Sequence, residues 1–222
     1  MKLTGLLSMA CAAMLTVACN GNGRTDVRDD SVVGTTGAAD VDHSASAGDR
    51  QFVEDLTYAG AAEIELGRMA AERGGDAEVK RFGQMMVDDH SKAGKELKDI
   101  ATQFHIPQPA GLDEKHSELM DKLAKLRGIE FDKQYIDAMV QGHEDVVDKL
   151  ESRVDERDRS AVITGQAPKD TNVKPEAADN HIEGSLNTWA AGALPVVKAH
   201  LDRAKSIQDA LKDRGRNTTA RN

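Results

Sequence analysis

The sequence predicts an all-α fold: a bundle of four long helices, with an extra short helix in the connection between the second and third. Apolar residues recur every three or four positions along four long segments, which is the spacing of one helix face. Glycine and proline separate these segments, and no strand-like alternation stands out. Only 3% of the residues are aromatic, so the core must consist of Leu, Val, Ile, Met and Ala.

Start and stop signals place the first helices. The first helix stops at Gly74-Gly75, and Asp76 is a good N-cap for the second. Prolines after residue 104 end that region, and Gly128 ends the short helix. The predicted helices cover about 49–73, 76–104, 113–127, 130–155 and 177–213.

The last helix follows a predicted loop. A polar stretch with Gly165, Pro168 and Pro175 predicts a loop, so the boundaries between 156 and 190 stay open. Pro195 lies inside the helix and predicts a kink or a split in two, because proline lacks the N–H that a helix interior needs. The bundle domain is expected at 51–213, followed by a disordered tail at 214–222.

The N-terminus has the pattern of an export signal. Lys2 precedes an apolar run of signal-peptide length, and residues 1–18 are predicted to be removed. The run ends in Leu-Thr-Val-Ala followed by Cys19, which resembles the bacterial lipobox, so Cys19 is the expected lipidation site. Ordinary cleavage that leaves Cys19 as a free thiol is the alternative. Residues 19–50 are rich in Gly, Asp, Ser, Thr and Ala and are predicted to form a disordered tether.

Composition restricts the partners. The net charge of -9 excludes nucleic acid, because phosphate binding needs a basic face. The membrane is an expected partner through the lipid anchor at Cys19. Asn20 is not the Asp that often retains such proteins in the inner membrane, so the periplasmic face of the outer membrane is the expected location. No feature of the sequence names a protein partner.

Each long helix carries one ionisable residue in the middle of its apolar stripe. In the last helix the stripe runs through Trp189, Ala193 and Val196. A buried polar group without a partner costs a few kcal/mol, so four such residues should satisfy one another at one level of the bundle. The four residues are Glu63, His90, His143 and His200.

Such a cluster predicts either a metal site or a metal-free hydrogen-bond network. Three imidazoles and a carboxylate suit a copper, zinc or iron ion. Met86 and Met139 lie one turn before a histidine on the same face and are soft ligands for copper(I), although ordinary core packing is the other interpretation. Further residues near the cluster in sequence are Glu65, Asp89 and Glu144, which would support the ligands or lie in solvent.

Four segments carry a family resemblance: Ala61–Gly67, Phe82–His90, Phe131–Glu144 and Leu194–Leu201. They resemble the domain-of-unknown-function 4142 family over about residues 50–208. The resemblance implies an exported, ferritin-like four-helix bundle with no settled activity. Ferritin-like di-iron sites use Glu three residues before His, whereas Val87, Val140 and Val197 occupy those positions here, so di-iron chemistry is not expected.

Catalytic motifs do not stand out. The chain has no nucleophile elbow, no phosphate-binding loop and no cysteine pair for redox work. We therefore expect a non-catalytic envelope lipoprotein that binds a metal ion through Glu63, His90, His143 and His200. The alternatives are a metal-free structural or stress-related binding module and, less favoured, an enzyme with a mononuclear site.

Overall fold

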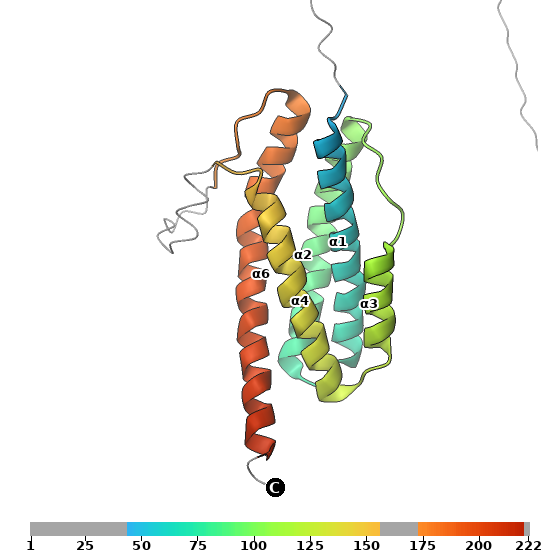
Figure 1. Cartoon of the computed structure of the whole chain (residues 1–222), viewed down its shortest axis with the longest axis vertical. Helices are drawn as coiled ribbons and strands as arrows, with labels where there is room; N and C mark the ends of the chain where they lie inside the picture. Colours follow the sequence, from blue (N-terminus) through green and yellow to red (C-terminus); the bar gives the residue numbers. More distant parts are fainter. Residues whose placement is uncertain (1–43, 156–172, 220–222) are drawn as a thin grey trace, which may run out of the picture. The chain divides into compact units, whose positions relative to one another are not determined.

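Five helices make up the part of the chain that the structure, a computed structural model, describes: residues 44–155 and 173–219, with side chains up to Arg214. The helices are α1 (Ala47–Arg73), α2 (Ala77–Gln103), α3 (Glu114–Ala124), α4 (Gly128–Glu151) and α6 (His181–Thr219). Four are long, and the short α3 lies between α2 and α4 in the chain (Figure 1). The predicted all-α fold with an extra short helix is therefore confirmed.

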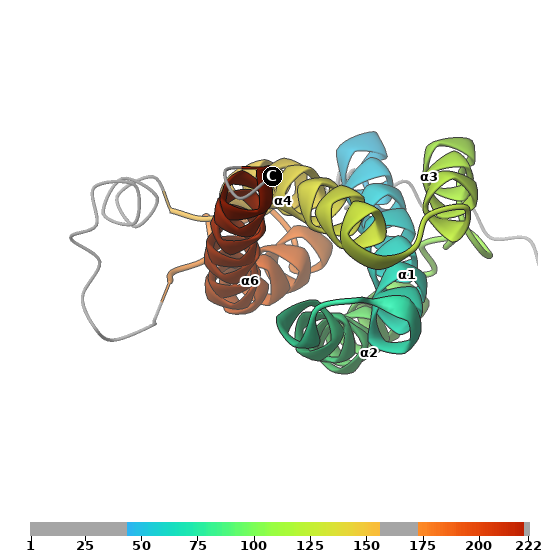
Figure 2. The same cartoon turned by 90° about the horizontal axis from the view of Figure 1, so that it is seen from below.

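The long helices pack as two pairs, and the members of each pair follow one another along the chain among the described long helices. The α1–α2 and α4–α6 contacts are the most extensive, and α3 packs on α1 and α4 (Figure 2). No described helix is both long enough and apolar enough to cross a membrane. The predicted signal peptide, Cys19 and the tether as far as residue 43 lie outside the described residues.

The α1 helix begins earlier than predicted, inside the segment assigned to the tether. Ser46 and Asp49 form a capping box, in which the Ser46 hydroxyl accepts from the Asp49 backbone and the Asp49 carboxylate accepts from the Ser46 backbone. Asp49 is 3% exposed and pairs at 2.8 Å with Arg153, just after α4. The Arg153 guanidinium also lies 4.5 Å from the centroid of the Phe52 ring. These contacts tie the start of α1 to the end of α4.

Three other helix boundaries differ from the predicted ones. Gly128, predicted to end the short helix, instead opens α4 with a φ of 56°, a backbone angle that glycine adopts without strain. The α4 helix ends at Glu151 rather than near 155. The α6 helix starts at His181 rather than near 177, since the Asn180 side chain accepts from the backbone of Ile182 and Glu183.

Pro195 does not split α6. The helix runs unbroken through it and continues past the predicted end at 213 to Thr219. Figure 1 shows α6 changing direction between its orange beginning and its red end. The face of this helix also differs from the prediction, because Val197 is 6% exposed whereas Val196, predicted to be core, is 45% exposed.

Asp132 is a buried carboxylate that the sequence pattern did not single out. It lies on α4, is 1% exposed, and accepts from the backbone N–H groups of Gly75 (2.9 Å) and Asp76 (2.8 Å). Burial raises the pKa of Asp132, although these two hydrogen bonds oppose the rise. The contact fixes the α1–α2 turn to the beginning of α4.

Two glycines let α1 and α2 approach closely. A Cβ added to Gly67 would lie 2.7 Å from the Gly83 carbonyl oxygen, and one added to Gly83 would lie 2.6 Å from the Gly67 oxygen. The backbones therefore touch at this crossing. Glu63 lies one turn from Gly67, and His90 lies two turns from Gly83, so the crossing holds the two polar side chains within reach of each other.

The apolar core consists of two clusters with a polar layer between them. Toward the start of α1 the first cluster includes Phe52, Leu56, Leu97, Leu150 and Leu186. Toward the end of α1 the second cluster includes Leu66, Phe82, Tyr135, Ile207 and Leu211. On every long helix, the ionisable residue of the stripe lies at the change from one cluster to the other.

The glycine crossing yields a paired prediction. Gly83→Ala should lower the free energy of unfolding by about 1–3 kcal/mol, because its methyl group has no room against the α1 backbone. Gly94→Ala on the same helix should raise it by about 0.5–1 kcal/mol, since an added Cβ meets nothing within 4 Å there. Urea unfolding followed by circular dichroism measures both. Equal effects of the two substitutions would contradict the close crossing.

Candidate metal centre

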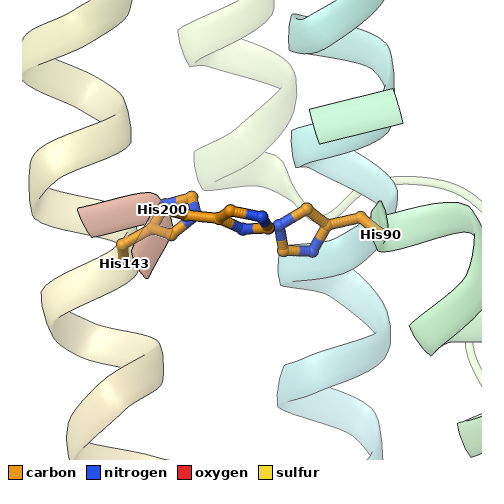
Figure 3. A group of neighbouring side chains, drawn as sticks. All are labelled: His90, His143 and His200. Atoms are coloured by element: carbon orange, nitrogen blue, oxygen red, sulfur yellow. The ribbon is translucent and has the colours of Figure 1, made fainter. Parts of the chain in front are cut away.

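Glu63, His90, His143 and His200 meet between the two apolar clusters, one from each long helix. Their exposed fractions are 5%, 8%, 0% and 3%. The three imidazole centroids form a nearly regular triangle with sides of 5.5, 5.4 and 5.6 Å. Figure 3 shows the three rings converging from different helices. The sequence prediction that these four side chains lie at one level therefore agrees with the structure.

Each carboxylate oxygen of Glu63 lies close to a nitrogen of a different histidine. Oε2 lies 3.0 Å from Nδ1 of His90, and Oε1 lies 3.2 Å from Nδ1 of His143. Burial alone would raise the pKa of Glu63, but the facing imidazoles of His90 and His143 lower it to about 2. The carboxylate is thus ionised, and it accepts a hydrogen bond from His90, while its other oxygen lies beside Nδ1 of His143.

His143 and His200 also each face a hydrogen-bond acceptor. The backbone carbonyl of Met139 lies 2.9 Å from Nδ1 of His143. The Asp89 carboxylate lies 2.9 Å from Nε2 of His200. Because a carbonyl and an ionised carboxylate can only accept, the nitrogen facing each of them must carry the hydrogen. These partners assign the tautomers of the neutral rings.

In the neutral form of each ring, one nitrogen has a lone pair and no partner. These atoms are Nε2 of His90, Nε2 of His143 and Nδ1 of His200, all buried and without a hydrogen bond among the described residues. One ligand nitrogen from each ring lies within 4.8 Å of the other two. A metal about 2.0–2.1 Å from each nitrogen in tetrahedral geometry would need nitrogens about 3.3–3.4 Å apart. The three side chains would have to bring these nitrogens up to about 1.5 Å closer together, and with that closure they would form a three-coordinate metal site.

Burial and neighbouring charges shift the pKa values of the three histidines in different directions. For His90, burial lowers the pKa, but the charge of Glu63 outweighs it and raises the pKa above its ordinary value. Burial lowers the pKa of His143 despite Glu63. Burial likewise lowers the pKa of His200 despite the hydrogen bond to Asp89. His143 and His200 are therefore neutral near pH 7, which is the form that binds a metal.

The residues predicted to support the cluster divide into two groups. Asp89 reaches His200, and Met139 reaches His143 through its backbone oxygen. The Met86 and Met139 side chains are buried in the second apolar cluster. Glu65 and Glu144 were predicted either to support the ligands or to lie in solvent, and they lie in solvent. Each is about half exposed, Glu65 paired with Arg68 and Glu144 with Lys205.

A comparison with protein families identifies the chain. The model of the family described as domain of unknown function (DUF4142) matches residues 34–167. The chain belongs to the DUF4142 family. The match includes Glu63, His90 and His143 and stops before α6, which carries His200. The predicted family is therefore confirmed, over a range that starts earlier and ends earlier than the predicted 50–208.

A solved structure has a similar fold. It is described as CopM in the Cu(II)-bound form, and it is similar to this DUF4142 protein with 18% sequence identity and a TM-score of 0.51. The similarity covers 73% of this chain and 96% of the other. At that identity, the similarity extends to the helical fold alone. No curated protein matches the chain.

Removing the charge of Glu63 should lower the pKa of His90. In Glu63→Gln, burial acts on His90 without an opposing carboxylate, so its pKa should fall below the ordinary value near 6.5. NMR titration of the histidine ring protons in metal-free protein measures this. Glu65→Gln is the matched control, since Glu65 is paired with Arg68 at the surface. An unchanged His90 pKa in Glu63→Gln would disprove the pairing.

Proposed function

We propose that this DUF4142 protein binds one transition-metal ion through His90, His143 and His200, without catalysing a reaction. The observation that carries the proposal is the set of three unpartnered nitrogens in a buried layer, each on a different helix. A metal-free network should satisfy its buried polar atoms, because each orphaned one costs about 1–3 kcal/mol. A bound cation would satisfy all three nitrogens at once.

Glu63 has a different role here from the one expected at first. The sequence alone placed it among four metal ligands, but its oxygens lie beside the Nδ1 atoms of His90 and His143, on the side of each ring away from the unpartnered nitrogen. We therefore assign Glu63 to orienting His90 and His143 and to balancing the positive charge of the ion, as carboxylates behind metal-bound histidines do. Asp89 orients His200 in the same way. Binding must also displace any proton that His90 holds.

Copper(II) is the ion that we expect to bind most tightly. Three imidazoles accept zinc, copper and iron, and the stability order of divalent ions places copper first. The similar fold of a protein described in a Cu(II)-bound form supports the same choice. The alternative function is a metal-free structural or stress-related module of the cell envelope, in which the four residues are only a polar network.

Metal retention tests the proposal. The full chain, free of affinity tags, is incubated with copper(II), zinc or iron(II), desalted and measured by elemental analysis. We expect about one copper per chain, less zinc and little iron, and an EPR signal of copper(II) split by imidazole nitrogens. The metal should also raise the melting temperature, because it binds the folded state.

Single variants then test the ligands. His90→Asn, His143→Asn and His200→Asn should each lose most of the copper while keeping the helical circular dichroism spectrum. His116→Asn is the matched control, because His116 lies at the start of α3 beside the capping residue Asp113. No retained metal in the unsubstituted protein, or equal loss in the control, would reject the proposed site.

We also propose that the protein is a lipoprotein, anchored by Cys19 to the periplasmic face of the outer membrane. The lipobox-like residues before Cys19 and the polar segment after it support this. Cys19→Ser should move the protein from the membrane fraction to the soluble fraction of the envelope. Cys11→Ser, inside the predicted signal peptide, should leave it in the membrane fraction. Fractionation and immunoblotting measure this, and an unmoved Cys19→Ser variant would contradict the anchor.

A further inference from the structure

The histidine layer is closed to solvent, so an ion can reach it only if a side chain or a helix moves. His90, His143 and His200 are each 8% exposed or less, and the nitrogen of each ring that would bind the metal is buried. Two hollows reach the layer from different sides of the bundle, and they touch different residues of it.

The first hollow, the α2–α6 cavity, has a volume of about 340 Å³. Glu63, His90 and His200 line its inner end. Gly94 on α2 and Gly192 on α6 also line it, and both are exposed, so the cavity opens to solvent between these two helices. The metal-binding nitrogens of the two rings stay turned into the bundle. Two of the three proposed ligands therefore stand at the end of an opening from solvent, but with their binding atoms facing away from it.

The second hollow lies among α1, α3 and α4 and has a volume of about 680 Å³. Its lining includes four aspartates, which would attract a cation. It reaches the layer only at Glu63, however, and none of the three histidines lines it. Glu63 lies beside the Nδ1 atoms of His90 and His143, and the nitrogens of those rings that would bind the metal are the opposite ones. An ion arriving from this side would meet the wrong edge of both rings.

The α2 and α6 helices are joined on one side of the layer and separated on the other. Near the start of α2, Asp76 and Glu78 form ion pairs with arginines of α6. Toward the end of α2, the cavity lies between the two helices. Asp89 and His200 form the contact at this change. The two helices also pack on each other less extensively than α1 on α2 or α4 on α6, so this seam is the easiest one to open.

His200 is the least firmly held of the three rings. His143 is 0% exposed, and His90 is bonded by Glu63, whose side chain is 6% exposed. The partner of His200 is Asp89, whose side chain is 45% exposed. Water competes for so exposed a carboxylate, and such a contact is weak. Rotation of His200 into the adjacent cavity would turn its Nδ1 from the centre of the bundle toward an incoming ion.

We infer that a metal ion enters through the α2–α6 cavity, and that His200, released by Asp89, meets it there and carries it to the other two rings. The inference rests on the proposed metal site and adds its route and its gate. In the closed state Asp89 holds His200 with Nδ1 inward. When that hydrogen bond breaks, the ring is free to turn into the cavity, and its return brings the ion to His90 and His143. Asp89 is a positioning residue in this step and not a ligand.

Stopped-flow fluorescence measures the rates of uptake and release. Trp189 is the only tryptophan in the chain and lines the α2–α6 cavity, so copper(II) bound nearby should quench its emission. The full chain is freed of metal and mixed with copper(II) for uptake, and the loaded protein is mixed with EDTA for release. The uptake rate should level off as the copper concentration rises, because opening of the gate then limits it.

Two alanine-to-leucine variants distinguish the two hollows. Ala93→Leu fills part of the α2–α6 cavity and should slow uptake and release alike, at least tenfold, so that the affinity at equilibrium stays within twofold. Ala138→Leu fills part of the hollow among α1, α3 and α4, and its rates should stay within twofold of the unsubstituted protein. Both alanines are partly exposed in the structure. Circular dichroism and thermal melting confirm that the variants are folded.

Two aspartate variants test the gate without filling any cavity. Asp89→Ala releases His200 and should speed copper uptake at least threefold. Asp88→Ala is the matched control, since it removes the same charge from the neighbouring position, where the carboxylate bonds Gln84 of its own helix. Its uptake rate should stay within twofold.

The outcomes separate the route from the metal site. Unchanged rates in Ala93→Leu, slower uptake in Ala138→Leu alone, or equal uptake by the two aspartate variants would overturn the inference and leave the metal site standing. An unsubstituted protein that binds no copper at equilibrium would overturn the metal site and the route together.

Discussion

An ionised carboxylate in the middle of the bundle is the constraint on which the rest of the structure depends. Glu63 is 5% exposed, and a buried charge is stable only if it is paired and hydrogen-bonded. Its two oxygens reach His90 on α2 and His143 on α4, so three helices must bring their polar residues to one level. Asp89 on α2 adds the fourth helix by binding His200 on α6.

The polar layer also sets the register of the helices. The apolar clusters on either side would tolerate a shift of one helix by a turn, because Leu, Val and Met fill space in many arrangements. The same shift would separate Glu63 from its histidines and leave a buried charge unpaired. The Gly67–Gly83 crossing acts with the layer, since it brings α1 and α2 close enough for the 3.0 Å contact between Glu63 and His90.

The arrangement of acceptors behind the histidines gives the site its chemical character. Glu63, Asp89 and the Met139 carbonyl each hold one nitrogen, and the opposite nitrogens face one another. A buried lone pair in each of three rings is a costly feature for a scaffold, but it suits a cation. With Glu63 occupied, three ligands remain, and the cavity lined by Trp189 lies beside His90 and His200.

The sequence by itself determined the helices, their stripes and the four polar residues, because periodicity and caps are local properties of the chain. The capping box at Ser46 was equally local and readable, although the prediction began the helix at 49. Only the tertiary structure decided that Glu63 lies against two histidines and that Glu144 faces solvent, since such contacts depend on partners from other helices. It also decided that Val197, not Val196, is core. Neighbouring residues on a helix differ by about 100° in direction, and the packing of α6 against the other helices determines which of them is covered.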